Sequence, residues 1–189
     1  MSKVYVLGPG GQYNHLIARR VSELGYDAHI RPLDTSLTDL ADCSSIIVGG
    51  GPGRLGLGDP ASVQLARTIR ECRVPVLGIC YGHQFIAKMY GGSVSPSPNP
   101  EFGPVDVDVV FEDELFNGLP GRLTVWMSHN DEVTEAPPRG VVLASSASNR
   151  FEALKIIDEQ VYGVQFHLEV EHTVHGKDIM GNFLRLGRR

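Results

Sequence analysis

The sequence predicts an α/β fold with a central, mostly parallel sheet and additional antiparallel strands. Two patterns carry this prediction. From residue 4 to residue 90, short apolar runs typical of strands occur among segments whose apolar residues recur at helical spacing. From residue 105 to residue 166, one strand-like run follows another. The length of 189 residues fits a single domain spanning residues 1–189.

The first part of the chain contains strands and helices in a β-α-β series. Apolar runs of four to six residues predict the strands, and apolar residues three and four positions apart predict the helices. In chain order we expect a strand at 4–7, a helix at 13–24, strands at 28–31 and 45–48, a helix at 62–72, a strand at 74–79 and a helix at 81–90. Such a series implies parallel strands joined by crossovers.

The second part has a different pattern. We expect strands at 105–111, 123–127, 141–145, 151–157 and 161–166, several of them separated by turn residues, and a last helix at about 174–186. Closely spaced strands of this kind pair mostly antiparallel. The intervening stretch 91–104 is rich in Ser, Pro and Gly and is expected to form a loop.

Composition excludes several classes of protein. The formal net charge of −5 gives no reason to expect nucleic-acid binding. No apolar run approaches the roughly 18 residues of a membrane helix, and the N-terminus lacks a signal-peptide pattern, so we expect no membrane association. Three cysteines without regular spacing argue against a disulfide framework and favour a reducing, cytoplasmic location.

The strongest chemical signal is a cysteine between a buried strand and a helix. Cys80 stands in the pattern Gly-x-Cys-x-Gly, with Gly78 and Gly82 on either side. This is the arrangement of a nucleophile elbow, in which small flanking residues allow a sharp turn that exposes the nucleophile. The N-terminus of the following helix would favour a thiolate, and the Tyr81 amide would be free to bind an oxyanion. The alternative is a buried structural cysteine.

A thiol nucleophile needs a base and a group that orients it. His167 and Glu169 are two residues apart, so in an extended segment their side chains leave on the same face. Glu169 could then bind one imidazole nitrogen while the other faces Cys80. The run Gly49–Gly51 follows a strand and would let the Gly51 amide act as a second oxyanion donor, although a simple tight loop is the alternative.

Three other patterns indicate different chemistry. Residues 51–56 match the dinucleotide fingerprint G-x-G-x-x-G, but no helix opens there. Several histidines and glutamates between 167 and 175 resemble metal ligands, but neither H-E-x-x-H nor a cysteine pair accompanies them, so no metal is expected. The chain also lacks a Walker loop and the Ser-Gly-Gly-x-Asp-Ser loop of pyrophosphatases, so we expect no cofactor in this chain.

Together these residues resemble class I glutamine amidotransferases, most closely the separate glutaminase subunits of archaeal-type GMP synthases. The resemblance covers nearly the whole chain. Its motifs are Gly-Ile-Cys-Tyr-Gly-His-Gln at 78–84, Gln-Phe-His-x-Glu at 165–169, and the stretches at 11–16, 126–133, 171–173 and 181–183. The Met-Ser-His-x-Asp stretch at 127–131 discriminates best, because amidotransferases of chorismate metabolism typically carry Tyr-His-Ser there.

The resemblance implies a flavodoxin-like three-layer fold and a set of site residues. The implied triad is Cys80, His167 and Glu169. Gly51 and Tyr81 would supply the oxyanion amides, and Gln84 with the backbone near Asn130 and Asp131 would hold glutamine. The sequence departs from the family pattern at Leu168, where proline is usual, and at Gly49, where serine is usual.

The resemblance further implies a glutaminase that hydrolyses glutamine through a Cys80 thioester. The ammonia would pass to a separate synthetase subunit of the ATP-pyrophosphatase type, which would bind ATP and Mg²⁺ and convert XMP to GMP. Three alternatives stay open: an amidotransferase for another acceptor such as chorismate, a catalytically silent regulatory subunit, or a cysteine hydrolase acting on peptides or γ-glutamyl conjugates.

Overall fold

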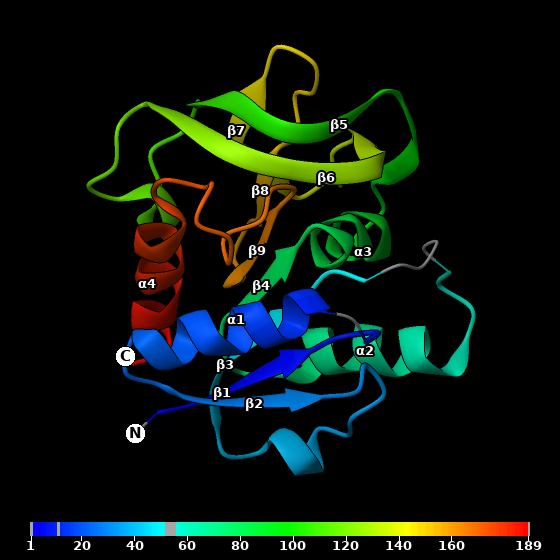
Figure 1. The fold of residues 1–189 in the computed structure, drawn as a ribbon. Coiled ribbons are helices and arrows are strands. Elements are labelled where there is room, and N and C mark those ends of the chain that lie inside the picture. The colour runs from blue at the N-terminus through cyan, green and yellow to red at the C-terminus, as the bar shows by residue number, and fades with distance from the viewer. Residues whose placement is uncertain (1, 11, 52–55, 189) are drawn as a thin grey trace.

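The computed structural model describes residues 2–10, 12–51 and 56–188. Within these residues, nine strands form one sheet in the order β2-β1-β3-β4-β9-β8-β7-β5-β6 (Figure 1). The strands are β1 Lys3–Leu7, β2 Asp27–Arg31, β3 Cys43–Val48, β4 Val76–Ile79, β5 Ser93–Val109, β6 Arg122–Glu135, β7 Gly140–Ser146, β8 Ala153–Ile156 and β9 Val161–Val164. The helices are α1 Gln12–Glu23, α2 Pro60–Glu71, α3 Tyr81–Met89 and α4 Gly176–Leu186, with 3-10 turns at Thr38–Leu40 and Glu114–Phe116.

The parallel half of the sheet consists of β2, β1, β3, β4 and β9, which all run in the same direction. Successive side chains point to opposite faces, so Val6 packs with α1 and α4 while Leu7 packs with α2 and α3. Helices therefore cover both faces, which makes three layers. The predicted α/β fold is confirmed.

The antiparallel half begins at β9, which pairs antiparallel with β8, and continues through β7, β5 and β6. Although β6 is the far edge of this sheet, Trp126 of β6 forms an isolated antiparallel bridge with His167, which lies just beyond β9. The sheet thus curls until its edge strand returns over the end of the parallel half.

The expectation of a loop at 91–104 is wrong, because β5 begins at Ser93 and runs without interruption to Val109. β5 pairs with β7 only over Val107–Val109, so most of its earlier residues have β6 as their one neighbour in the sheet. The pairing with β6 also skips between Pro96 and Glu101. Prolines are tolerated at such free edges and bulges, which explains how a proline-rich segment forms a strand.

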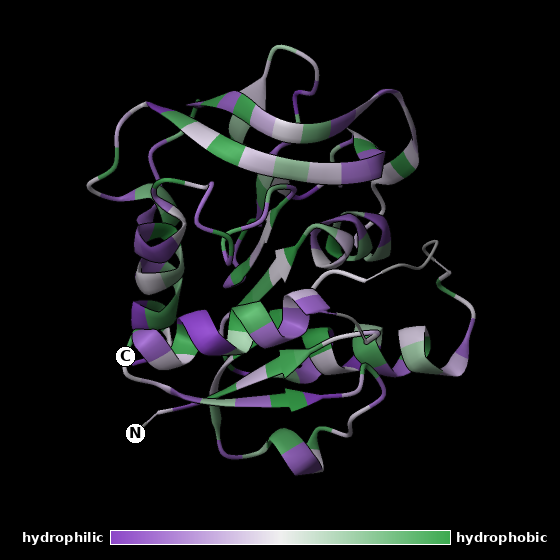
Figure 2. Cartoon of the chain, in the orientation of Figure 1, coloured by the Kyte–Doolittle hydropathy of each residue, from purple (hydrophilic) through white to green (hydrophobic). Residues whose placement is uncertain are grey.

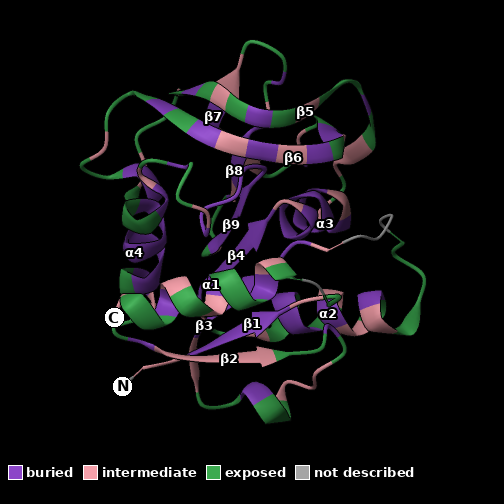
Figure 3. Cartoon of the chain, viewed as in Figure 1, coloured by how far each residue is buried: buried purple, intermediate pink, exposed green. Residues whose placement is uncertain are grey.

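Burial differs between the two halves. Residues of β4 and β9 are buried throughout, as expected for strands with helices on both faces. β6 instead alternates between buried and exposed residues over its first part, and Figures 2 and 3 show the matching alternation of hydropathy and exposure along the β5–β6 ribbon.

No helix in the described part of the chain is long and apolar enough to cross a membrane.

Candidate active site

A pocket of about 860 Å³ lies where the carboxyl ends of β3, β4 and β9 meet, with the β5–β6 ribbon forming its opposite wall. In open parallel sheets this edge is the usual place for a ligand. Seven of the eight candidate residues named from the sequence line the pocket, and Glu169 stands behind His167. The full lining is Gln12, Tyr13, Gly50, Gly51, Cys80, Tyr81, Gln84, Pro96, Ser97, Pro100, Phe102, Ser128, His129, Asn130, Asp131 and His167.

Cys80 occupies the sharp turn between β4 and α3 with φ 53° and ψ −102°. Such a backbone conformation is strained in a residue other than glycine and is typical of functional sites. The two flanking glycines make the turn possible. A Cβ at Gly78 would lie 2.3 Å from the backbone carbon of Gly82, and a Cβ at Gly82 would lie 2.2 Å from the carbonyl oxygen of Val48.

His167 and Glu169 form a buried pair in which His167 Nδ1 donates to Glu169 Oε1 at 2.6 Å. The other ring nitrogen is left for Cys80. Burial by itself would lower the pKa of His167, but its interactions with Cys80 and Glu169 raise that pKa to about 10. The contact with Glu169 thus favours the imidazolium form of the ring. Tyr13 of α1 stacks on it with ring centroids 4.5 Å apart.

The backbone of His167 is fixed from the opposite wall. Its amide donates to the carbonyl oxygen of Trp126 at 3.0 Å. Thr173 Oγ1 donates to the His167 carbonyl at 2.5 Å and accepts from the Trp126 amide at 2.9 Å. Leu168, which replaces the proline usual in the family, is completely buried in the core. These contacts hold the His-Glu segment without a proline.

The absence of side chains at Gly50 and Gly51 lets the backbone after β3 lie close to its neighbours. A Cβ on Gly50 would lie 3.6 Å from His167 Cε1 and 3.8 Å from Cys80 Cβ, and one on Gly51 would lie 2.1 Å from Pro9 Cγ. Tyr81 is the first residue of α3, so its amide has no helical partner and remains available at the pocket. Gly51 and Tyr81 both line the pocket together with Cys80. Their role as oxyanion donors stays a prediction.

Gly49 stands where serine is usual in the family, and the structure shows what uses the space. A Cβ on Gly49 would lie 2.0 Å from Asn14 Oδ1, and one on Gly8 would lie 2.0 Å from Asn14 Nδ2. The buried Asn14 side chain therefore fills the gap between the ends of β1 and β3.

The three candidate glutamine-binding residues differ in their contacts. Gln84 uses its side-chain nitrogen within the protein, donating to the Asp131 carbonyl at 2.6 Å and to Gln165 Oε1 at 3.1 Å. Asn130 is exposed on the pocket wall. The Asp131 carbonyl thus serves Gln84, while Asn130 lines the pocket as an exposed residue.

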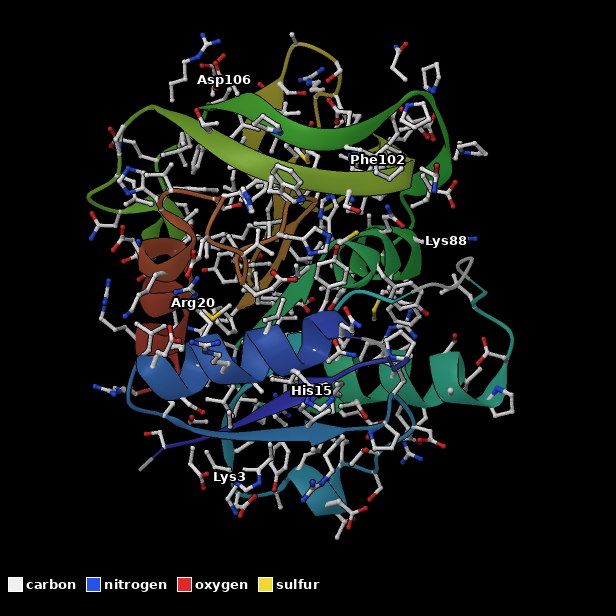
Figure 4. All side chains as sticks on the ribbon, viewed as in Figure 1. Lys3, His15, Arg20, Lys88, Phe102 and Asp106 are labelled. Atoms are coloured by element: carbon white, nitrogen blue, oxygen red, sulfur yellow. The ribbon has the colours of Figure 1, made fainter. Side chains whose placement is uncertain are left out.

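Sequence reasoning did not single out Tyr13, Gln165 or Thr173. Gln165 Nε2 donates to Cys80 Sγ at 3.6 Å. Phe102 was not singled out either; it is labelled in Figure 4 on the β5–β6 ribbon, lines the pocket and is 65% exposed. Tyr13, Gln165 and Thr173 each belong to a stretch that carried the family resemblance, but their roles depend on contacts with distant segments. The residues between 51 and 56 that suggested a dinucleotide site lie mostly outside the described ranges.

The histidines after residue 167 have other partners than a metal. His172 packs against the Trp126 ring, with centroids 4.4 Å apart, and His175 Nδ1 contacts Asp178 at 3.0 Å. Over the ranges that the structure covers, no three His, Cys, Asp or Glu side chains are grouped so that they could hold a metal ion.

Comparisons with known proteins agree with this geometry. The family pattern described as "Glutamine amidotransferase class-I" matches residues 6–186. The chain is 41% identical over 189 residues to a glutamine-hydrolysing GMP synthase subunit of Ignicoccus hospitalis, covering 100% of both chains. It is 43% identical over 187 residues to a glutamine-hydrolysing GMP synthase of Aeropyrum pernix, covering 97% of this chain but 36% of that longer protein.

A solved structure is also similar over the full length. The crystal structure of a protein from Thermoplasma acidophilum, described as a GMP synthase subunit, superimposes with a TM-score of 0.93 at 37% identity, covering 100% of this chain and 94% of that one. The shared fold, the strained cysteine turn and the family match over residues 6–186 agree. This chain belongs to the class I glutamine amidotransferase family.

Proposed function

We propose that the chain is the glutaminase subunit of a GMP synthase, with Cys80, His167 and Glu169 as its catalytic triad. The observation that carries the proposal is the assembled site: a strained, pocket-lining cysteine faces a buried imidazole, which in turn is bound by a buried carboxylate. This is the nucleophile, base and orienting group that thiol catalysis requires.

The reaction begins when Cys80 Sγ attacks the side-chain carbonyl carbon of glutamine. The amides of Gly51 and Tyr81 stabilise the oxyanion of the tetrahedral intermediate. His167 gives its proton to the departing nitrogen, so ammonia leaves and a γ-glutamyl thioester remains on Cys80. His167 then takes a proton from water, which attacks the thioester and releases glutamate. Glu169 keeps the ring in the orientation that both steps require.

The glutamine would lie along the wall formed by Gln84, Asn130 and Asp131. All three residues line the pocket, and Gln84 is held there by its hydrogen bond to the Asp131 carbonyl. The pocket of about 860 Å³ has room for a free amino acid.

The ammonia passes to a separate synthetase subunit that binds ATP and Mg²⁺ and aminates XMP. Support for this partner comes from the relatives: full-length matches are named as one lettered subunit of a GMP synthase, while the match named as a whole GMP synthase is covered over only 36% of its length. We place the reaction in the cytoplasm, which suits an enzyme whose three cysteines are all free thiols.

The test is glutamate release from glutamine by wild type and Cys80→Ala, each alone and with the separately made synthetase subunit, XMP and Mg-ATP. We expect weak release by the lone wild type, stronger release with the loaded partner, and none by Cys80→Ala. Cys80-dependent release that ignores this partner would keep the glutaminase and reject the GMP assignment. An active Cys80→Ala variant would reject the mechanism itself.

A further inference from the structure

The Cys80 sulfur has a neighbour that the mechanism above does not use. Gln165 is the first residue after β9 and is completely buried. Its side-chain nitrogen lies 3.6 Å from Cys80 Sγ in donor geometry. A buried amide N–H directed at a sulfur stabilises the negative charge of a thiolate more than that of a neutral thiol.

The orientation of the Gln165 amide follows from its contacts. Asp131 offers a backbone carbonyl, which only accepts hydrogen bonds, so Gln84 must direct its NH₂ group toward it at 2.6 Å. The same NH₂ group donates to Gln165 Oε1 at 3.1 Å. With its oxygen occupied in this way, Gln165 can direct only its own NH₂ group toward the sulfur.

The side-chain amides of Gln84 and Gln165 are held in place from the opposite wall of the pocket. The Asp131 carbonyl also accepts from His129 Nδ1 at 3.0 Å, and His129 Nε2 lies 3.1 Å from Glu101 Oε2. Glu101 belongs to β5 at the point where its pairing with β6 resumes. Hydrogen bonds therefore connect the β5–β6 ribbon to the sulfur through Gln84 and Gln165.

We propose that Gln165 is a further catalytic residue, which stabilises the Cys80 thiolate by a hydrogen bond to its sulfur, and that Gln84 is a positioning residue that orients the Gln165 amide. The inference rests on the proposed function, in which Cys80 is the nucleophile. It also gives Gln84 a role distinct from holding glutamine, because its nitrogen already serves two partners within the protein.

The test measures the reactivity of the Cys80 sulfur directly, without glutamine or a partner subunit. Alkylation of Cys80 by iodoacetamide is followed against pH in the full chain, by mass spectrometry of the Cys80 peptide. The variant Gln165→Met keeps the length of the side chain and removes the donor. The matched control is Gln160→Met, an exposed glutamine just before the same strand. His167, the titratable group that faces the sulfur, and Glu169 behind it stay in place in every variant.

We expect Gln165→Met to slow alkylation at pH 7 about tenfold and to move the pH profile to higher pH, because a hydrogen bond to a charged group is lost. Gln84→Met should act in the same direction and about threefold, since it frees the Gln165 amide to turn. The double variant should be no slower than Gln165→Met alone, whereas Gln160→Met should match wild type.

A Gln165→Met profile that coincides with wild type would overturn the proposal, and so would additive effects of the two substitutions. Thermal unfolding checks that each variant is folded. If Gln165→Met does not fold, Gln84→Met decides by itself, because the hydrogen bond from the Gln84 side chain orients the Gln165 amide and the substitution leaves the Gln84 backbone unchanged. Failure of the proposed function would appear separately, as glutamine hydrolysis that persists in Cys80→Ala.

Discussion

The parallel and antiparallel halves of the sheet contribute to the pocket in different ways. In the parallel half, β3, β4 and β9 end at one edge, and the segment that follows each of them carries a site residue, as at Gly51, Cys80 and His167. In the antiparallel half, a single long ribbon passes across that edge and presents residues from within its strands, as at Ser128. The reactive groups thus stand on a backbone buried between helices, and the ribbon encloses them.

The backbone of the parallel half has little room to adjust, and Gly82→Ala tests this most severely. The new Cβ would lie 2.2 Å from the Val48 carbonyl oxygen, which is backbone of β3 and cannot move aside as a side chain would. We expect a loss of about 4 kcal/mol of unfolding free energy, or failure to fold. Thermal and urea unfolding measure the change.

The matched control lies in the turn before β6. A Cβ on Gly121 would meet nothing within 4 Å, so Gly121→Ala should change stability by less than about 0.5 kcal/mol. Equal losses in the two variants would show that the loss at Gly82 does not come from the contact with Val48.

The antiparallel half contains a buried glutamate whose pKa should differ between the folded and the unfolded chain. Glu152 is completely buried beside β8, with one oxygen accepting from Ser146. Burial raises its pKa, the Ser146 hydrogen bond opposes this, and repulsion from Glu101 and Glu132 adds to the rise, which brings the pKa to about 8. The folded state therefore binds the proton more tightly than the unfolded chain does.

The sign of the pH effect follows from that difference. As pH rises from about 4.5 to about 8, wild type should lose stability relative to Glu152→Gln, on the order of 2 to 4 kcal/mol, and the gap should stay constant above pH 8. Unfolding in urea at several pH values measures the gap. The exposed Glu112→Gln is the control and should track wild type at every pH. A gap independent of pH would refute the prediction.

Thr173 tests the junction between the halves, because it binds the His167 carbonyl on one side and the Trp126 amide on the other. Thr173→Val keeps the shape and removes both hydrogen bonds, so we expect a loss of about 2 kcal/mol in stability. Glutamine hydrolysis should fall about tenfold in kcat through misplacement of His167. Thr173→Ser should restore most of the activity. A valine variant with normal kcat would show that the Trp126–His167 backbone bridge is sufficient.

The two halves also differ in how far the sequence predicted them. The strand at 4–7 was located to within one residue because its side chains are buried on both faces and form a continuous apolar run. The Cys80 turn was equally evident, since the glycine requirement is local. Gln165 and Thr173 act through partners 85 and 47 residues away, at Cys80 and Trp126, which no local pattern reveals. The strand at 93–104 was missed because its prolines are tolerated only where one edge is free.

The smallest expected effect is at a proline of this strand. Pro98 is exposed and falls where the pairing of β5 with β6 is interrupted, so it contributes no ladder hydrogen bond there. Pro98→Ala should therefore change the unfolding free energy by less than about 0.5 kcal/mol. Val107 of the same strand is buried and pairs with both Leu123 and Ser146, so Val107→Pro should cost at least about 3 kcal/mol. Urea unfolding compares the two. A large loss from Pro98→Ala would mean that the proline itself stiffens the ribbon over the pocket, and that the antiparallel half depends on local sequence as much as the parallel half does.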